Sequence, residues 1–73
     1  MANSVYKVIT VIGSSTESFE KAAEAAVAAA SKTLKGVHVA EVQEFFMHVE
    51  AGKITSYRAK VQVAFEYNKK FKK

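Results

Sequence analysis

The chain has 73 residues, no cysteine, 25% charged residues and a formal net charge of +4. So short a chain forms one small domain, expected here over residues 1–73, and it buries only about 60% of its unfolded surface. No apolar run approaches the roughly 20 residues of a membrane span, the N-terminus lacks the core of a signal peptide, and the missing cysteines exclude disulfides and thiolate metal sites. We therefore expect a cytoplasmic protein, without a membrane span, that gains stability from partner subunits.

The N-terminal part predicts a strand followed by a helix. Residues 5–12 are largely β-branched and apolar, which is typical of a strand buried on much of both faces. The segment "GSSTES" then interrupts the pattern. Ser14 and Glu17 have capping-box spacing and Thr16 is a competing N-cap, so a helix is predicted to begin here and to run to about Leu34.

The predicted helix has one apolar stripe, and most of the stripe is alanine. Its members recur at helical spacing: Phe19, Ala22, Ala23, Ala26, Val27, Ala30 and Leu34. Small side chains permit close approach to a sheet, and Gly36 suits the left-handed position after the helix. The outward Ala25, Ala28 and Ala29 reflect either helix propensity alone or a helix packed on a second side.

Two further strands are expected at about 37–50 and 53–67, joined by the turn "EAGK" with Gly52 at positive φ. The third strand alternates cleanly between apolar and polar residues. The second changes phase: Val37 and Val39 are predicted on one face and Ala40, Val42 and Phe46 on the other. Phe45, Met47 and Val49 are predicted to return to the first face.

The element order is therefore β-α-β-β, an α+β fold. A helical crossover that leaves room for one strand predicts an antiparallel sheet in the order 1-3-2, wrapped around one helix. One helix covers only one face of such a sheet, yet the first two strands are apolar on both. Exposed patches of that size indicate association, so the pattern predicts a homo-oligomer.

The net charge comes from the C-terminal tail. Residues 1–68 contain seven basic side chains and seven glutamates, so the whole excess is Lys69, Lys70, Lys72 and Lys73. We expect a folded core over about 4–67 and a flexible basic tail over 68–73. A body without a net basic field is not expected to bind nucleic acid specifically.

No constellation of catalytic residues emerges from the sequence. His38 and His48 have no carboxylate at ligand-like spacing, and there is no Cys or Asp for a nucleophile, a triad or a zinc site. Glu41 and Glu44 are expected on opposite strand faces. The sequence therefore predicts a protein that is not an enzyme.

The chain resembles the dodecin family over about residues 4–67. The resemblance lies in "VYKVI", "GSSTESFE", "VAEV" and "YRAKVQVAFEY". It implies a β-α-β-β subunit assembled into a hollow homododecamer. Many dodecins bind flavins such as riboflavin, FMN, FAD or lumichrome as stacked pairs between subunits.

Two flavin-site positions differ from the family pattern. Where many dodecins have a tryptophan that stacks on the flavin ring, "VAEV" has Val39, and where they have a glutamine, this chain has Arg58. Stacking is worth about 1–3 kcal/mol per ring, and an arginine has donors but no acceptor. The resemblance thus implies a small-molecule binding or storage protein with a weakened or lost flavin site.

"VAEV" also resembles a dodecin branch without the tryptophan, for which calcium binding is proposed. Calcium needs six to eight oxygen ligands, so only glutamates gathered from several subunits could bind it, for example Glu17, Glu20 and Glu24. These carboxylates are also explained as helix-dipole and surface charges. A calcium-binding cage and a purely structural cage remain the alternatives to flavin binding.

Overall fold

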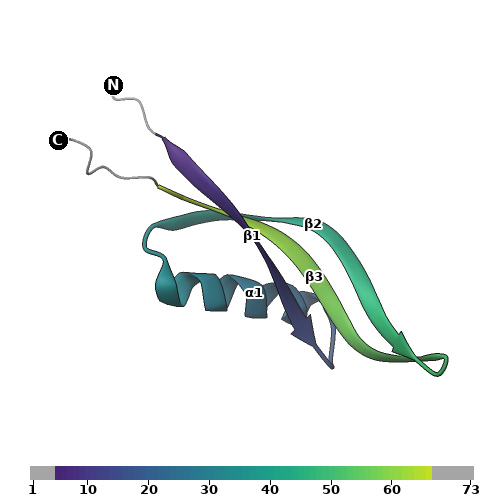
Figure 1. Ribbon diagram of the computed structural model, residues 1–73. Helices are drawn as coiled ribbons and strands as arrows, with labels where there is room; N and C mark the ends of the chain where they lie inside the picture. Colours follow the sequence, from purple (N-terminus) through teal and green to yellow (C-terminus); the bar gives the residue numbers. More distant parts are fainter. Residues whose placement is uncertain (1–4, 67–73) are drawn as a thin grey trace.

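The computed structural model describes residues 5–66. Its elements are β1 (Tyr6–Ser15), α1 (Phe19–Thr33), β2 (Val37–Glu50) and β3 (Lys53–Glu66). The strands form one antiparallel sheet in the order β1-β3-β2, which confirms the predicted fold class. Figure 1 shows the sheet curving over one side of α1 and the β2–β3 hairpin projecting past the helix. The predicted basic tail, 68–73, lies outside the described residues.

Strand β1 ends three residues later than predicted, at Ser15 rather than at residue 12. Gly13, Ser14 and Ser15 continue the ladder with β3, where Ser14 lies opposite Arg58 and Ser15 opposite Tyr57. The serines suggested a helix start because they are common N-caps, but the long β3 offers their backbone groups pairing partners. Sheet pairing therefore overrides the local capping signal.

The N-cap of the helix is Ser18 rather than Ser14 or Thr16. The backbone of Ser18 is extended, with φ −165°, and its Oγ accepts a hydrogen bond from the backbone N–H of Lys21 at 3.0 Å. Ser15 Oγ accepts a bond from the N–H of Glu17 at 2.9 Å, which tightens the turn before the helix. The predicted capping box is wrong, and Ser18 satisfies a free N–H of the first turn.

The core is a thin layer between α1 and the sheet. Six buried residues form it: Ala22, Ala26 and Ala30 from α1, and Ala59, Val61 and Val63 from β3. Gly13 lies opposite Ala59, directly under the helix. A Cβ on Gly13 would collide with the carbonyl of Ala22 and lie 2.8 Å from the backbone nitrogen of Ala26. The close approach predicted from the alanines is present, and it also requires this glycine.

β-Bulges explain the change of phase in β2. The register shifts between Val37 and Val39 and again between Val42 and Glu44, so that β2 has one extra residue at each place. Val37 then lies opposite Phe65, whereas Val39 lies opposite Ala64. Opposite residues share a face of the sheet, so the prediction that Val37 and Val39 share one is wrong.

The bulges place most of the apolar side chains of β2 on the side of α1. By register, this inner face of β2 carries Val37, Ala40, Val42, Phe45 and Met47. The predicted separation of Val42 from Phe45 and Met47 is also wrong, because an extra residue restores the phase of the strand.

The turns at both ends of β2 use positive φ. Ala51 has φ 51° and Gly52 φ 77°, as a two-residue type I′ hairpin requires. The sequence predicted this conformation for the glycine alone. Gly36 has φ 75°, one residue beyond the predicted position, because the C-cap is Leu34.

Candidate functional site

The face of the sheet that α1 leaves uncovered contains both predicted flavin-site positions. We call it the outer face. Cross-strand pairing assigns to it Tyr6, Val8, Thr10, Ile12 and Ser14 of β1, Val39, Glu41, Glu44, Phe46 and His48 of β2, and Ser56, Arg58, Lys60, Gln62, Ala64 and Glu66 of β3. We call a set of residues that lie opposite one another across β1, β3 and β2 a row.

Val39 lies in an apolar row without an aromatic ring. Ala64 lies opposite it on β3 and Val8 opposite Ala64 on β1. The side chain of Val39 is 58% exposed and that of Val8 51% exposed. This part of the outer face is therefore an uncovered aliphatic patch, which can make apolar contacts but provides no flat ring surface.

Arg58 lies in the centre of the outer face, between Ser14 of β1 and Phe46 of β2. The residue is half-buried, and its Nε is buried without a hydrogen-bond partner among residues 5–66. A buried donor normally has a partner, since an unmade hydrogen bond costs about 1–3 kcal/mol. Arg58 is therefore incompletely satisfied within one chain.

One chain does not bring Val39 and Arg58 together. Val39 pairs with Ala64, six residues along β3 from Arg58, which corresponds to about 20 Å at about 3.3 Å per residue. A ligand that touched both positions would need to lie between two copies of the chain.

Both histidines have carboxylate neighbours that the sequence analysis missed. His48 Nε2 lies 3.1 Å from Glu50 Oε2, and His38 Nε2 lies 4.0 Å from Glu66 Oε1. Alternation on β2 suggests the first pair, two residues apart, but the second depends on the sheet register. These side chains are exposed, so the pairs contribute little stability.

The three glutamates considered for calcium lie at the start of the helix. Glu17 precedes the N-cap and pairs with Lys21 at 3.7 Å. Glu20 lies in the first turn and Glu24 one turn later, and both are exposed. Among residues 5–66, no group of three or more His, Asp or Glu side chains converges to hold a metal ion.

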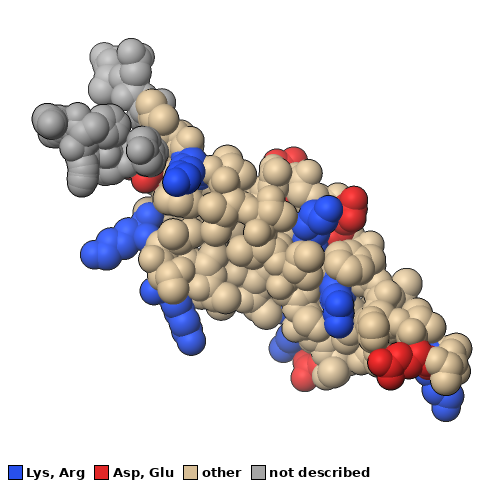
Figure 2. All heavy atoms as spheres, in the orientation of Figure 1, with Lys and Arg blue, Asp and Glu red and all other residues tan. Residues whose placement is uncertain are grey.

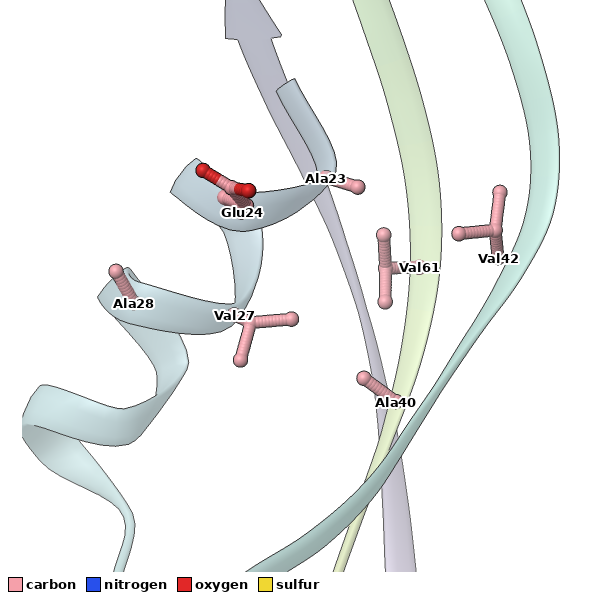
Figure 3. Close-up of a pocket in the computed structure, with 7 residues that line it drawn as sticks. All are labelled: Ala23, Glu24, Val27, Ala28, Ala40, Val42 and Val61. Carbon is pink, nitrogen blue, oxygen red and sulfur yellow. The ribbon is translucent and has the colours of Figure 1, made fainter. Parts of the chain in front are cut away.

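A shallow apolar groove lies between α1 and β2. Its volume is about 410 Å³, and it is lined by Ala23, Glu24, Val27, Ala28, Ala40, Val42 and Val61. Figure 3 shows Ala23 and Val27 turned toward the strands, with Glu24 and Ala28 farther from them. The groove exists because α1 packs mainly on β1 and β3. The sequence did not reveal it, since helical periodicity does not fix the sideways position of a helix on a sheet.

Large apolar side chains are exposed on both faces of the sheet. On the inner side Val42 is 40% and Phe45 51% exposed, and on the outer side Ile12 is 56% exposed. Figure 2 shows a broad uncharged area over the middle of the molecule in one view. The described residues contain no helix long and apolar enough to cross a membrane. Exposed apolar patches of this kind usually mark a contact surface.

Comparisons with known proteins agree with this geometry. A family profile described as Dodecin matches residues 5–68. The chain is 50% identical over 64 residues to calcium dodecin of Mycobacterium tuberculosis, covering 86% of this chain and 89% of that one. The crystal structure of calcium dodecin, described as a calcium-chelating immunodominant antigen with a novel calcium-binding site, matches with a TM-score of 0.80 and 44% identity, covering 92% and 96% of the two chains. Dodecin from Streptomyces coelicolor matches with a TM-score of 0.87 and 28% identity, covering 94% and 99%.

Proposed function

The chain belongs to the dodecin family, and from this premise we propose that it forms a hollow homododecamer that binds calcium in place of a flavin, without enzymatic activity. The observation that carries the proposal is the exposed aliphatic side chain of Val39 at the flavin-stacking position. The aliphatic patch and the unpaired Arg58 suit protein contacts better than a flat polar ring.

The size of the core supports self-assembly. Among residues 5–66, the buried residues of the core are four alanines and two valines, whereas ten large hydrophobic side chains are exposed. The chain measures 55 × 19 × 15 Å, with a radius of gyration of 15.2 Å, compared with roughly 11 Å for a compact chain of this length. An elongated subunit with so thin a core requires partners to bury its apolar surface.

Two features weaken flavin binding. A valine cannot replace the stacking energy of an aromatic ring, about 1–3 kcal/mol per ring. The Arg58 guanidinium can donate to a carbonyl of the flavin but cannot accept a hydrogen bond from the ring N–H. We therefore expect weak binding of riboflavin, FMN or FAD in the apolar slot beside Val39.

The carboxylates at the start of α1 support calcium as the ligand. Glu20 and Glu24 lie one helical turn apart, and neither has an ion-pair partner among the described residues. One chain cannot supply the six to eight oxygens that calcium needs. Copies related by symmetry can, if they bring Glu17, Glu20 and Glu24 together. The similarity to a calcium dodecin favours this ligand.

Calorimetric titration of the assembled, chelator-treated protein with calcium tests the proposal. We expect saturable binding that is lost when Glu20 and Glu24 are both changed to Gln, because the site then loses charged oxygen ligands. Glu50→Gln, a similar change at the far end of the hairpin, serves as the control and keeps full binding. Absence of binding up to about 10 mM calcium, well above the weakest protein sites, overturns the proposal.

A flavin titration separates the two ligand classes. The wild-type protein is expected to leave riboflavin fluorescence nearly unchanged at micromolar concentration. The double variant Val39→Trp, Arg58→Gln restores the ring and the amide, so its affinity should rise by roughly tenfold or more. Tight flavin binding by the wild-type chain would instead make flavin storage the function.

A further inference from the structure

The unsatisfied Arg58 provides the starting point for an inference about the subunit contact. Its Nε has already lost contact with water in the single chain, and no acidic side chain pairs with it among residues 5–66. The nearest cation on the outer face, Lys60, has its own partner in Glu44 at 3.7 Å. Arg58 is thus a half-buried positive charge that lacks a counter-charge.

The outer face also carries an acidic side chain without a partner. Of its three glutamates, Glu44 pairs with Lys60 and Glu66 with His38. Glu41 forms no ion pair with any described residue, and it is exposed. The imidazole of His38, 4.0 Å from Glu66, is a counter-charge only when it is protonated. Among the described residues of the outer face, Arg58 is therefore the cation without an ion-pair partner, and Glu41 is the carboxylate with neither a basic nor an imidazole neighbour.

The positions of these two charges fit a twofold contact. Glu41 lies in the row of Thr10 and Gln62, two rows along β3 from the row of Arg58, and the row of Ile12, Lys60 and Glu44 lies between them. Two copies can pack outer face to outer face with a twofold axis along the middle row, the row of Lys60. The row of Arg58 in each copy then lies over the row of Glu41 in the other copy. Arg58 then faces Gln62, with Glu41 one strand spacing away, about 4.8 Å.

We propose that Arg58 of one copy binds the carboxylate of Glu41 of a second copy across a twofold contact between their outer faces. The proposal rests on the proposed self-assembly and identifies the side chains that join two of the subunits. Two equivalent ion pairs form at each contact, and each gives the half-buried guanidinium of Arg58 a charged acceptor.

The middle row suits this arrangement. On the axis, each of its residues meets its own copy, so the exposed Ile12 packs against another Ile12. Lys60 would meet a second lysine, but each is neutralised within its own chain by Glu44. The contact thus buries apolar surface without leaving a net charge at its centre.

Charge reversal tests the pairing. The variants are Arg58→Glu, Glu41→Arg and the double exchange, with Lys35→Glu, an exposed residue between α1 and β2, as the control for net charge. Light scattering over a dilution series gives the concentration at which assembly is half complete. Each single reversal should raise that concentration by at least roughly tenfold, because like charges then meet at two places. The double exchange should restore assembly, and the control should match the wild type.

Three outcomes decide the question. Single variants that assemble like the wild type overturn the proposal while self-assembly stands. A double exchange that fails to restore assembly shows that Arg58 and Glu41 are not partners. A monomeric wild type overturns the proposed assembly itself. If circular dichroism finds a charge-reversed variant unfolded, Arg58→Gln and Glu41→Gln replace it. Each of these variants must weaken assembly. The double variant must lose less free energy of assembly than the two single variants lose together.

Discussion

Single residues decide how closely the helix and sheet approach and what the outer face can bind. Gly13 allows the backbone of α1 to lie directly on β1, because any side chain there would collide with the helix. Val39 and Arg58 have a comparable effect on the outer face, since the first provides no stacking surface and the second adds a half-buried charge.

Replacement of Gly13 by alanine should destabilise the protein by about 1–3 kcal/mol, the usual cost of overpacking a core. The added Cβ must push the helix away at Ala22 and Ala26, and this separates the alanines from the sheet. Urea unfolding measures the loss, and Gly13→Val should lose more than Gly13→Ala. Equal midpoints for all three proteins would show that the helix shifts without cost.

Secondary-structure elements in this chain are positioned by pairing as much as by their own sequence. Strand β1 extends through serines that favour a helix cap, because β3 offers it a partner at every position from Tyr6 to Ser15. Strand β2 keeps Val42, Phe45 and Met47 on one face because a bulge restores its phase. The N-cap of the helix is consequently Ser18, four residues after Ser14, the first serine that could have capped it.

Ser18→Ala should cost about 1 kcal/mol, because the N–H of Lys21 loses its acceptor. Thr16→Ala is the matched control, since Thr16 lies outside the helix and makes no hydrogen bond within the described residues. Thermal unfolding followed by circular dichroism at 222 nm compares the two variants. A larger effect at Thr16 than at Ser18 would contradict the assignment of the N-cap.

The single chain is elongated, and its hydrophobic core is one thin layer between the helix and the sheet. One helix covers one side of a long sheet, and the hairpin extends beyond it (Figure 1). Large apolar side chains remain exposed on both faces of the sheet. The hydrophobic effect favours covering this surface, which supports the proposed self-assembly.

The midpoint of thermal unfolding should therefore rise with protein concentration, as expected when unfolding is coupled to dissociation. Scanning calorimetry over a hundredfold range of concentration measures the shift. The Arg58→Glu variant should show a lower midpoint than the wild type at every concentration. A wild-type midpoint that stays constant over this range, together with the mass of a single chain, would contradict self-assembly.

The order of elements, the antiparallel sheet with β3 in the centre, and the alanine face of α1 were predictable from the sequence. Alternation in residues 53–66, helical spacing from Phe19 to Leu34 and the glycine turn are local signals, and they depend on neighbouring residues alone. The resemblance to dodecins also located Val39 and Arg58, and pairing puts both on the uncovered face.

Tertiary structure alone decided the remaining features. The bulges in β2, the longer β1, the groove beside α1 and the missing partner of Arg58 all depend on how separate elements meet. A bulge adds one residue and moves the side chains beyond it to the opposite face, so periodicity read along one strand cannot assign faces across it. An unpaired buried donor is likewise a property of everything packed around it, and it becomes visible only once the chain is folded.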